Sequence, residues 1–170
     1  MDRSAAWRPA TLNDLDAVMA IQGVVHALLP ERREVMAEKL GLCPAGCRLL
    51  ARDGDVMGYG LSHPWRLGGV PALDRPLGAI PDDADCFYLH DVALLPAARG
   101  RGAGRAFVDH VRAEARRRDV AALALVSVYG TVPLWSTLGF AVRELPGLAA
   151  KLGPYGTEAR YMVSDLDALR

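Results

Sequence analysis

One stretch of the sequence, Phe87–Val111, limits the choice of fold more than any other. Residues 87–95 are mainly aromatic and aliphatic and end before a proline, a pattern that predicts a β-strand. Residues 103–118 place apolar side chains at helical spacing among arginines and glutamates, which predicts an amphipathic helix. Between them lies Arg99–Gly104, which reads Arg-Gly-Arg-Gly-Ala-Gly. The chain must therefore place a strand, a bare glycine-rich turn and a helix in direct succession.

The glycine-rich turn has the properties of an anion-binding site. Glycines allow a tight turn and leave backbone N–H groups uncovered, and a helix start adds unpaired N–H groups and a partial positive charge. These features suit a diphosphate. A P-loop is excluded because Gly104 is followed by Arg105 and Ala106, not by Lys and Ser/Thr. A dinucleotide fingerprint fits poorly because Arg105 stands where a small residue is needed, and Asp119 precedes the next strand instead of ending it. A glycine-rich helix start that binds nothing is the remaining alternative.

The same turn resembles the acyl-CoA-binding motif of the GNAT superfamily of N-acetyltransferases, Gln/Arg-x-x-Gly-x-Gly/Ala, which Arg99, Gly102 and Gly104 match. The opening Trp-Arg-Pro-Ala-Thr and the segment 134–140 also resemble that family, so the resemblance covers nearly the whole chain. It implies acetyl-CoA as the co-substrate, with its pyrophosphate in the turn and its pantetheine arm along the preceding strand. The cofactor-binding residues that it implies are Val92, Ala93, Leu94, Arg99, Gly100, Arg101, Gly102, Ala103 and Gly104.

Further strands and helices are expected on both sides of this stretch. A short strand over 7–9 precedes helical spacing from Leu12 to Leu29, which Pro30 ends, and a second helix is expected over 31–40. The later expected elements are strands 47–52 and 56–63 around an Asp53-Gly54 hairpin turn, a loop over 65–85, a buried strand 121–128, a helix 132–138, and strands from 139 and over 159–163. These elements predict an α/β fold. The resemblance implies a mixed, mostly antiparallel central sheet flanked by helices, with a splayed strand pair that holds acyl-CoA.

Composition restricts the class of protein and its partners. With 170 residues, 51% of them hydrophobic and 24% charged, residues 1–170 are expected to form a single globular domain. The zero formal net charge gives no electrostatic reason to expect a nucleic-acid or membrane partner. The N-terminus lacks an apolar signal core and the cysteine number is odd, so a cytoplasmic protein without disulfides is expected. No metal is expected, because Cys43, Cys47 and Cys86 do not show zinc-ligand spacing.

Transfer of an acetyl group from a thioester to an amine requires a base, donors for the developing oxyanion and good positioning. Strand alternation places His90 on one face with Val92 and Leu94, and Asp91 on the other, so His90 is the candidate base. A core histidine bonded to a carbonyl is the alternative for His90. The family commonly has a tyrosine four residues before Gly139, where this chain has Trp135, whose indole cannot act as an acid. Tyr129 is therefore the candidate acid, although it could equally be a packed aromatic residue.

The sequence thus leads to a functional hypothesis. We expect an N-acetyltransferase that transfers an acetyl group from acetyl-CoA to a primary amine of a small molecule or a peptide. The acceptor pocket is expected to arise from the loop 65–85 and the C-terminal segment, and a homodimer is a further expectation that the resemblance permits. The alternative, which Trp135 motivates, is a non-catalytic acyl-CoA-binding sensor or partner module. A nucleic-acid binder using Arg116–Arg118 is disfavoured by the neutral net charge.

Overall fold

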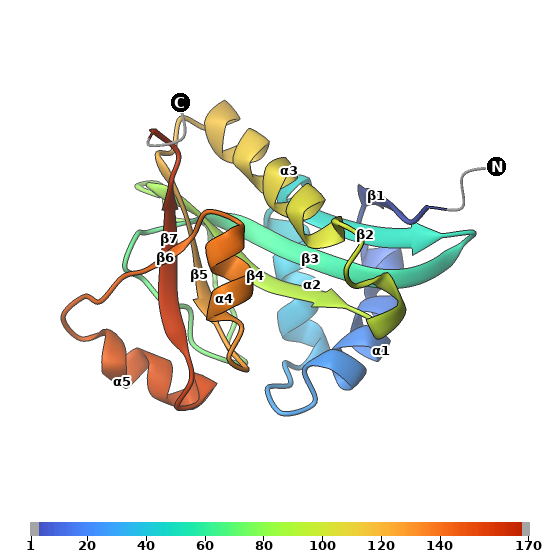
Figure 1. Ribbon diagram of the computed structural model, residues 1–170, viewed down its shortest axis with the longest axis horizontal. Helices are drawn as coiled ribbons and strands as arrows, with labels where there is room; N and C mark the ends of the chain where they lie inside the picture. Colours follow the sequence, from blue (N-terminus) through green and yellow to red (C-terminus); the bar gives the residue numbers. More distant parts are fainter. Residues whose placement is uncertain (1–3, 168–170) are drawn as a thin grey trace.

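The computed structural model describes residues 4–167, which contain one seven-stranded sheet in the order β1-β2-β3-β4-β5-β7-β6 (Figure 1). Neighbouring strands are antiparallel except β4 and β5, which run parallel, so the mixed and mostly antiparallel sheet is confirmed. The strands are β1 (Ala6–Pro9), β2 (Cys47–Arg52), β3 (Asp55–Trp65), β4 (Cys86–Leu94), β5 (Ala122–Ser127), β6 (Ala141–Val142) and β7 (Arg160–Asp165).

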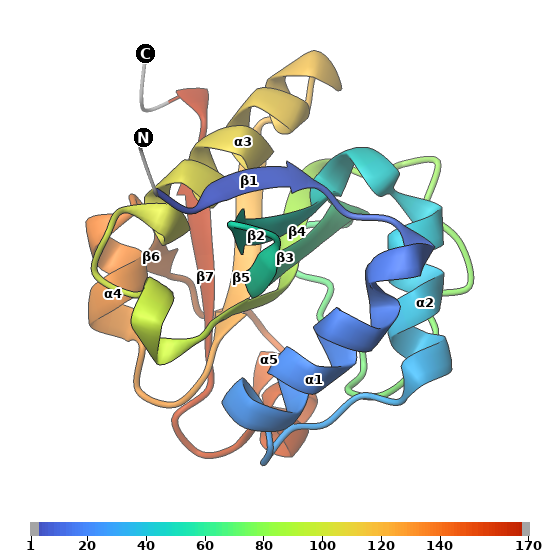
Figure 2. The same ribbon diagram turned by 90° about the vertical axis from the view of Figure 1, so that its right-hand side faces the viewer.

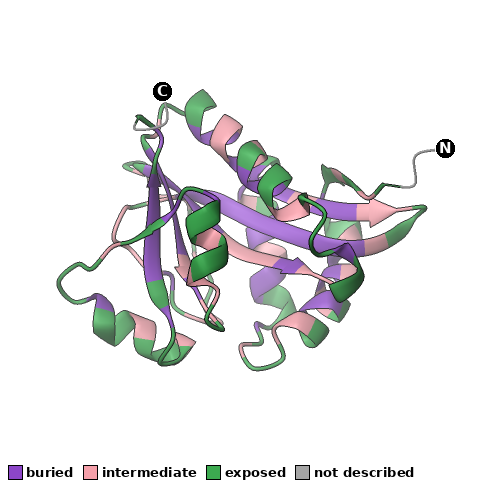
Figure 3. Ribbon diagram, viewed as in Figure 1, coloured by how far each residue is buried: buried purple, intermediate pink, exposed green. Residues whose placement is uncertain are grey.

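Helices cover both faces of the sheet, as Figure 2 shows. One face packs against α1 (Leu15–Val25) and α2 (Arg33–Leu42), and the opposite face packs against α3 (Ala103–Arg117). The shorter helical elements are α4 (Val132–Thr137), α5 (Leu148–Leu152) and the 3-10 turns η1 (Leu12–Asp14), η2 (Pro44–Gly46), η3 (Pro96–Ala98) and η4 (Gly153–Tyr155). The central strands are buried between these layers (Figure 3). None of the helices within residues 4–167 is long and apolar enough to cross a bilayer.

The sheet divides between β4 and β5. These strands pair in parallel from Cys86 and Ala122 as far as Leu89 and Leu125, and no pairing between them continues beyond that point. Farther along, β4 pairs only with β3, and β5 pairs only with β7. The two halves of the sheet therefore diverge, which is the splayed arrangement that the resemblance implied.

A β-bulge in β4 lies at the point of divergence. Leu61 pairs with Asp91 but Ser62 pairs with Leu89, so His90 has no partner in β3. A bulge inserts one residue and disturbs the alternation of side chains. The side chains of His90 and Asp91 consequently both point toward the α1–α2 side of the sheet, where they contact Glu31 and His26 respectively. The expectation that His90 shares a face with Val92 and that Asp91 lies opposite was wrong for this reason.

Two segments differ from expectation because of tertiary contacts. Helix α1 ends at Val25, although helical spacing continues to Leu29, since His26 leaves the helical conformation with φ −116° and ψ 37°. The loop over 66–85 is bound to the body of the molecule, and it does not line the main cavity. Its backbone amides at Leu77 and Gly78 donate to the Glu38 carboxylate. The expected acceptor-binding role of this loop therefore finds no support in the geometry.

Candidate active site

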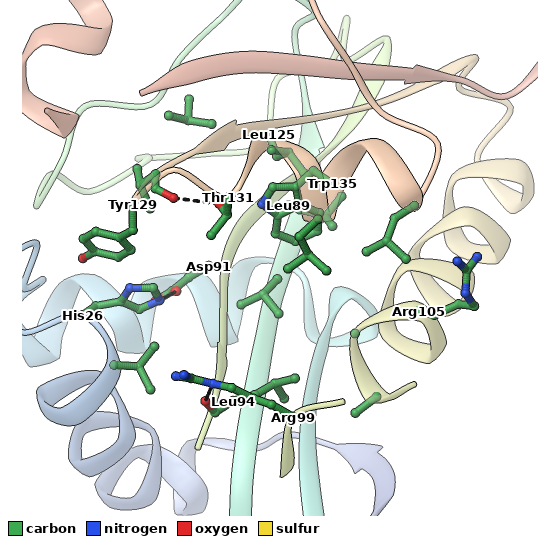
Figure 4. Close-up of a pocket in the computed structure, with 18 of the residues that line it drawn as sticks. His26, Leu89, Asp91, Leu94, Arg99, Arg105, Leu125, Tyr129, Thr131 and Trp135 are labelled. Atoms are coloured by element: carbon green, nitrogen blue, oxygen red, sulfur yellow. Dashed lines mark hydrogen bonds and ion pairs between the residues drawn. The ribbon is translucent and has the colours of Figure 1, made fainter. Parts of the chain in front are cut away.

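A cavity of about 590 Å³ occupies the gap between β4 and β5 (Figure 4). One wall is the divergent half of β4, and the other wall is the end of β5 with the following loop and α4. The glycine-rich turn before α3 closes one part of the cavity, and the end of α1 contributes to another. The cavity is thus a direct result of the incomplete pairing between the two parallel strands.

The glycine-rich turn presents open backbone to this cavity. Gly100 and Gly102 have left-handed φ values of +72° and +78°, which glycine adopts without steric cost. A Cβ atom added at Gly100, Gly102 or Gly104 would meet nothing within 4 Å. The first bond of the helix is donated by Ala106 to the Gly102 carbonyl at 3.0 Å, so the preceding amides lie before the helical ladder. Open glycine backbone directly before a helix start is the arrangement that the predicted anion site requires, and anion binding by it stays a prediction.

Most residues predicted to bind the cofactor line this cavity, namely Val92, Leu94, Arg99, Gly100, Gly102, Ala103 and Gly104. Ala93 does not, because its side chain is buried on the other face of β4 beside Tyr59. The exposed Arg101 lines a separate hollow of about 160 Å³ next to Trp7. The Arg99 side chain donates through Nε to the Leu94 carbonyl at 3.0 Å and so fastens the turn to the end of β4.

The opposite wall carries the aromatic residues Tyr129 and Trp135. Tyr129 has a left-handed φ of +57° and follows the end of β5. Burial, with a smaller effect from the Asp91 charge, raises the pKa of Tyr129 above its ordinary value. Its hydroxyl is therefore protonated at neutral pH and can donate. Trp135 packs edge-on against Phe140, with ring centroids 5.8 Å apart, and its indole offers no titratable proton.

His90 lies in a buried polar network on the α1–α2 side of β4. Its Nε2 is 3.2 Å from Glu31 Oε1, and its Nδ1 is 3.3 Å from His63 Nε2. The Lys39 ammonium is 3.4 Å from the other oxygen of Glu31. Burial alone would raise the pKa of Glu31, but the His90 hydrogen bond and the charges of His90 and Lys39 lower it to about 2. Burial and the charge of His90 lower the pKa of His63 to about 3, so His63 is neutral.

A second polar cluster, which the sequence did not reveal, contributes to the cavity wall. His26 Nε2 lies 2.7 Å from Asp91 Oδ1, and the other oxygen of Asp91 accepts a hydrogen bond of 2.6 Å from the Tyr59 hydroxyl. The His26 ring stacks on Tyr129, with centroids 5.8 Å apart and planes inclined by 19°. Burial alone would lower the pKa of His26, but the hydrogen bond and charge of Asp91 raise it above the ordinary value. No local motif links His26 to Asp91, because only the folded sheet brings them together.

Comparison with known proteins agrees with this geometry. A family model described as the acetyltransferase (GNAT) family matches residues 17–140. No curated protein matches the chain. Solved structures with the same fold include the loading GNATL domain of CurA from Lyngbya majuscula, which is 14% identical with a TM-score of 0.78. The alignment covers 96% of this chain and 98% of that domain.

Two further structures of the same fold contain coenzyme A. N-acetylglutamate synthase from Neisseria gonorrhoeae, complexed with coenzyme A and N-acetyl-glutamate, is 19% identical with a TM-score of 0.72. That alignment covers 98% of this chain but 36% of the synthase. Rv2747 from Mycobacterium tuberculosis, in complex with CoA and NLQ, is 18% identical with a TM-score of 0.69 over 95% of this chain and 99% of that protein.

Proposed function

The chain belongs to the acetyltransferase (GNAT) family, whose chemistry is acyl transfer from acyl-CoA, and from this premise we propose that it is an acetyl-CoA-dependent N-acetyltransferase. Its acceptor would be the primary amine of a small molecule or a peptide. One observation carries the proposal: the cavity between β4 and β5 begins at a turn whose backbone amides are open to a diphosphate. The coenzyme A in two structures of the same fold supports it.

In the proposed complex, the pyrophosphate of acetyl-CoA lies against the amides of Gly100, Arg101, Gly102, Ala103 and Gly104. Arg99 fixes the position of this turn through its bond to the Leu94 carbonyl. The pantetheine arm then runs along β4 past Leu94, Ala93 and Val92, with Ala93 contributing only its backbone because its side chain is buried on the other face. This path directs the thioester toward Asp91 and Tyr129.

The proposed binding of the pyrophosphate by the glycine-rich turn can be tested at Gly104. Its helical position shows no left-handed φ and an added Cβ would touch no protein atom, so Gly104→Val fills the turn without straining the fold. We expect this variant to weaken acetyl-CoA binding at least about tenfold in isothermal titration, because a side chain there covers the amides that would meet phosphate. Gly41→Val, in the open space of α2, is the matched control and should bind normally. Absence of binding by the native protein would refute the proposal.

The reaction itself is tested by thiol release from acetyl-CoA across a panel of primary amines and N-terminal peptides. Acetylated product, identified by mass, is the expected result. Trp135, at the position of the family tyrosine, favours a second candidate: a module that binds acyl-CoA without turning it over. That candidate gains if the native protein binds acetyl-CoA tightly yet acetylates no amine and releases no thiol.

A further inference from the structure

His26 and Asp91 lie at the part of the cavity that receives the thioester in the proposed complex. Both residues line the cavity, as do the glycine-rich turn and Tyr129. Figure 4 shows His26 beside Asp91 and Tyr129, on the side of the cavity away from Arg105. A coenzyme whose diphosphate occupies the turn would therefore extend its reacting end toward this group.

We propose that His26, oriented by Asp91, is the catalytic base that takes the proton from the attacking amine. This inference rests on the proposed N-acetylation and extends it to a residue directly after α1 that no motif identifies. The amine nitrogen forms a bond to the thioester carbon while one of its protons passes to the imidazole. The carbon–sulfur bond then breaks, and its electron pair leaves on the coenzyme A sulfur as a thiolate. That thiolate takes a proton from the Tyr129 hydroxyl. His26⁺ then releases its proton to solvent, and Tyr129, which is 41% exposed, takes one from solvent, so both groups return to their starting states.

His90, the base that the sequence favours, also lines the cavity, but its contacts place it badly for this task. Both of its ring nitrogens are occupied inside the protein, by His63 and by the ionised Glu31. Its side chain is only 3% exposed, whereas the His26 side chain is 14% exposed. A base must offer a lone pair to the substrate, and His90 would have to break an internal contact to do so. His26 Nε2 is buried against Asp91, so the accessible surface of the His26 side chain belongs to the part of the ring that faces away from that carboxylate.

Asp91 and Tyr59 hold His26 in one orientation. A carboxylate behind an imidazole fixes the tautomer and stabilises the imidazolium that forms when the proton is taken. Here the carboxylate is itself fixed, because the oxygen that does not face His26 accepts the Tyr59 hydroxyl bond of 2.6 Å. The other groups that face His26 are the Tyr129 ring from the loop after β5, the Val92 backbone of β4 and the Glu31 charge from the α1–α2 link. Asp91 is therefore a positioning residue.

Tyr129 offers a proton donor where the chain departs from the family pattern. Trp135 replaces the tyrosine that commonly lies near the thiol, so α4 supplies no titratable proton to the cavity. The His26–Tyr129 stack supplies two titratable groups that face each other across the divergent strands. One comes from the end of α1 beside β4, and the other follows β5.

The test compares His26→Gln, Asp91→Asn and His90→Gln, with His110→Gln as the control, because His110 lies on α3, bonds the Ala45 carbonyl and does not line the cavity. Each variant is first titrated with acetyl-CoA, so that a lost cofactor site is recognised. Turnover is then measured with the best amine of the panel and, without any amine, as hydrolysis of acetyl-CoA, in which water needs the same base. We expect His26→Gln to lower kcat at least about 10²-fold with unchanged acetyl-CoA affinity. His110→Gln should match the native enzyme.

The pH dependence separates a base from a merely structural residue. In the native enzyme, kcat/KM should rise with pH through the ionisation of His26, and His26→Gln should lose this limb. Asp91→Asn should shift the limb to lower pH, because the charge that favours the imidazolium is removed. If His26→Gln keeps both turnover and the limb while His90→Gln loses them, the inference is overturned. If the native protein neither acetylates nor hydrolyses, the proposed function itself has failed.

Discussion

At the scale of single residues, the most costly arrangement is the buried network of Lys39, Glu31, His90 and His63. Lys39 is 1% exposed, and a charge that far from water is stable only beside a partner. Glu31 is the partner of Lys39, and its carboxylate also contacts His90 and accepts a hydrogen bond from the Asp74 amide. The network joins α2, β4, β3 and the loop over 66–85, so its protonation state is a property of the whole fold.

We expect acid to destabilise the protein through this network. The pKa of Glu31 is lowered from 4.5 to about 2 and that of His63 from 6.5 to about 3, so the unfolded chain binds more protons than the folded one. Stability is therefore complete above the unfolded values and is lost as pH falls, first from about 6.5 through His63 and then from about 4.5 through Glu31. Between pH 6 and 5, the free energy of unfolding should fall by about 1 kcal/mol for each pH unit.

Urea unfolding at pH 7, 6 and 5 measures this slope. His63→Gln keeps a neutral polar side chain and should flatten the slope over this range, whereas His110→Gln, at a residue of α3 that bonds the Ala45 carbonyl, should not. The raised pKa of His26 acts in another window, because its stabilisation is complete below 6.5 and is lost only as pH rises above that value. Equal slopes in the native protein and His63→Gln would show that His63 does not carry the effect.

At the scale of elements, local chemistry predicted most strands and helices, and tertiary contacts decided the rest. Two turns follow from the conformational preferences of their own residues. They are the Asp53-Gly54 turn between β2 and β3 and the glycine-rich turn before α3. The end of α1 and the bulge at His90 have no such local signal. At these two places His26 and Asp91 meet on one face of the sheet, and this pairing is also what the sequence missed in the candidate site. The cofactor turn could be predicted because its signal lies in consecutive residues. The His26–Asp91 pair could not, because its two residues are far apart in the sequence and meet only in the folded protein.

Close packing between β3 and α3 gives a test at this scale. A Cβ on Gly60 would lie 2.3 Å from the ring of Phe107, a fully buried residue of α3 that packs on the sheet. We expect Gly60→Ala to lower the free energy of unfolding by about 2 kcal/mol, because the ring has no space to withdraw. The double variant with Phe107→Leu should recover part of this loss, and Gly41→Ala is the control without any neighbour. An undiminished free energy of unfolding for Gly60→Ala would contradict the packing described here.

At the scale of the whole molecule, two half-sheets share a short parallel junction. Only the first part of β4 and β5 is paired, and the cavity separates them beyond it. In the proposed complex, a bound coenzyme touches both walls of the gap. Binding would therefore be reported by the stability of the entire chain and not only by local changes near the turn.

Acetyl-CoA at about a hundred times its dissociation constant should stabilise the native protein by about 2.7 kcal/mol. The reason is linkage, since the assembled cavity exists only in the folded state. Thermal unfolding with and without acetyl-CoA measures the change, and Gly104→Val should show little of it at the same concentration. An equal rise in Tm for both proteins would place the ligand somewhere other than the glycine turn.

The unpaired margins of β4 and β5 have one more consequence. Exposed strand edges normally invite other chains to add to a sheet, and proteins protect them with charges, prolines or bulges to avoid aggregation. Here the two unpaired edges lie on opposite walls of the cavity, which residues of α3 and α4 also line. The unpaired backbone groups are thus available to a ligand inside the cavity, and they do not form an outer sheet edge on which another chain could add a strand.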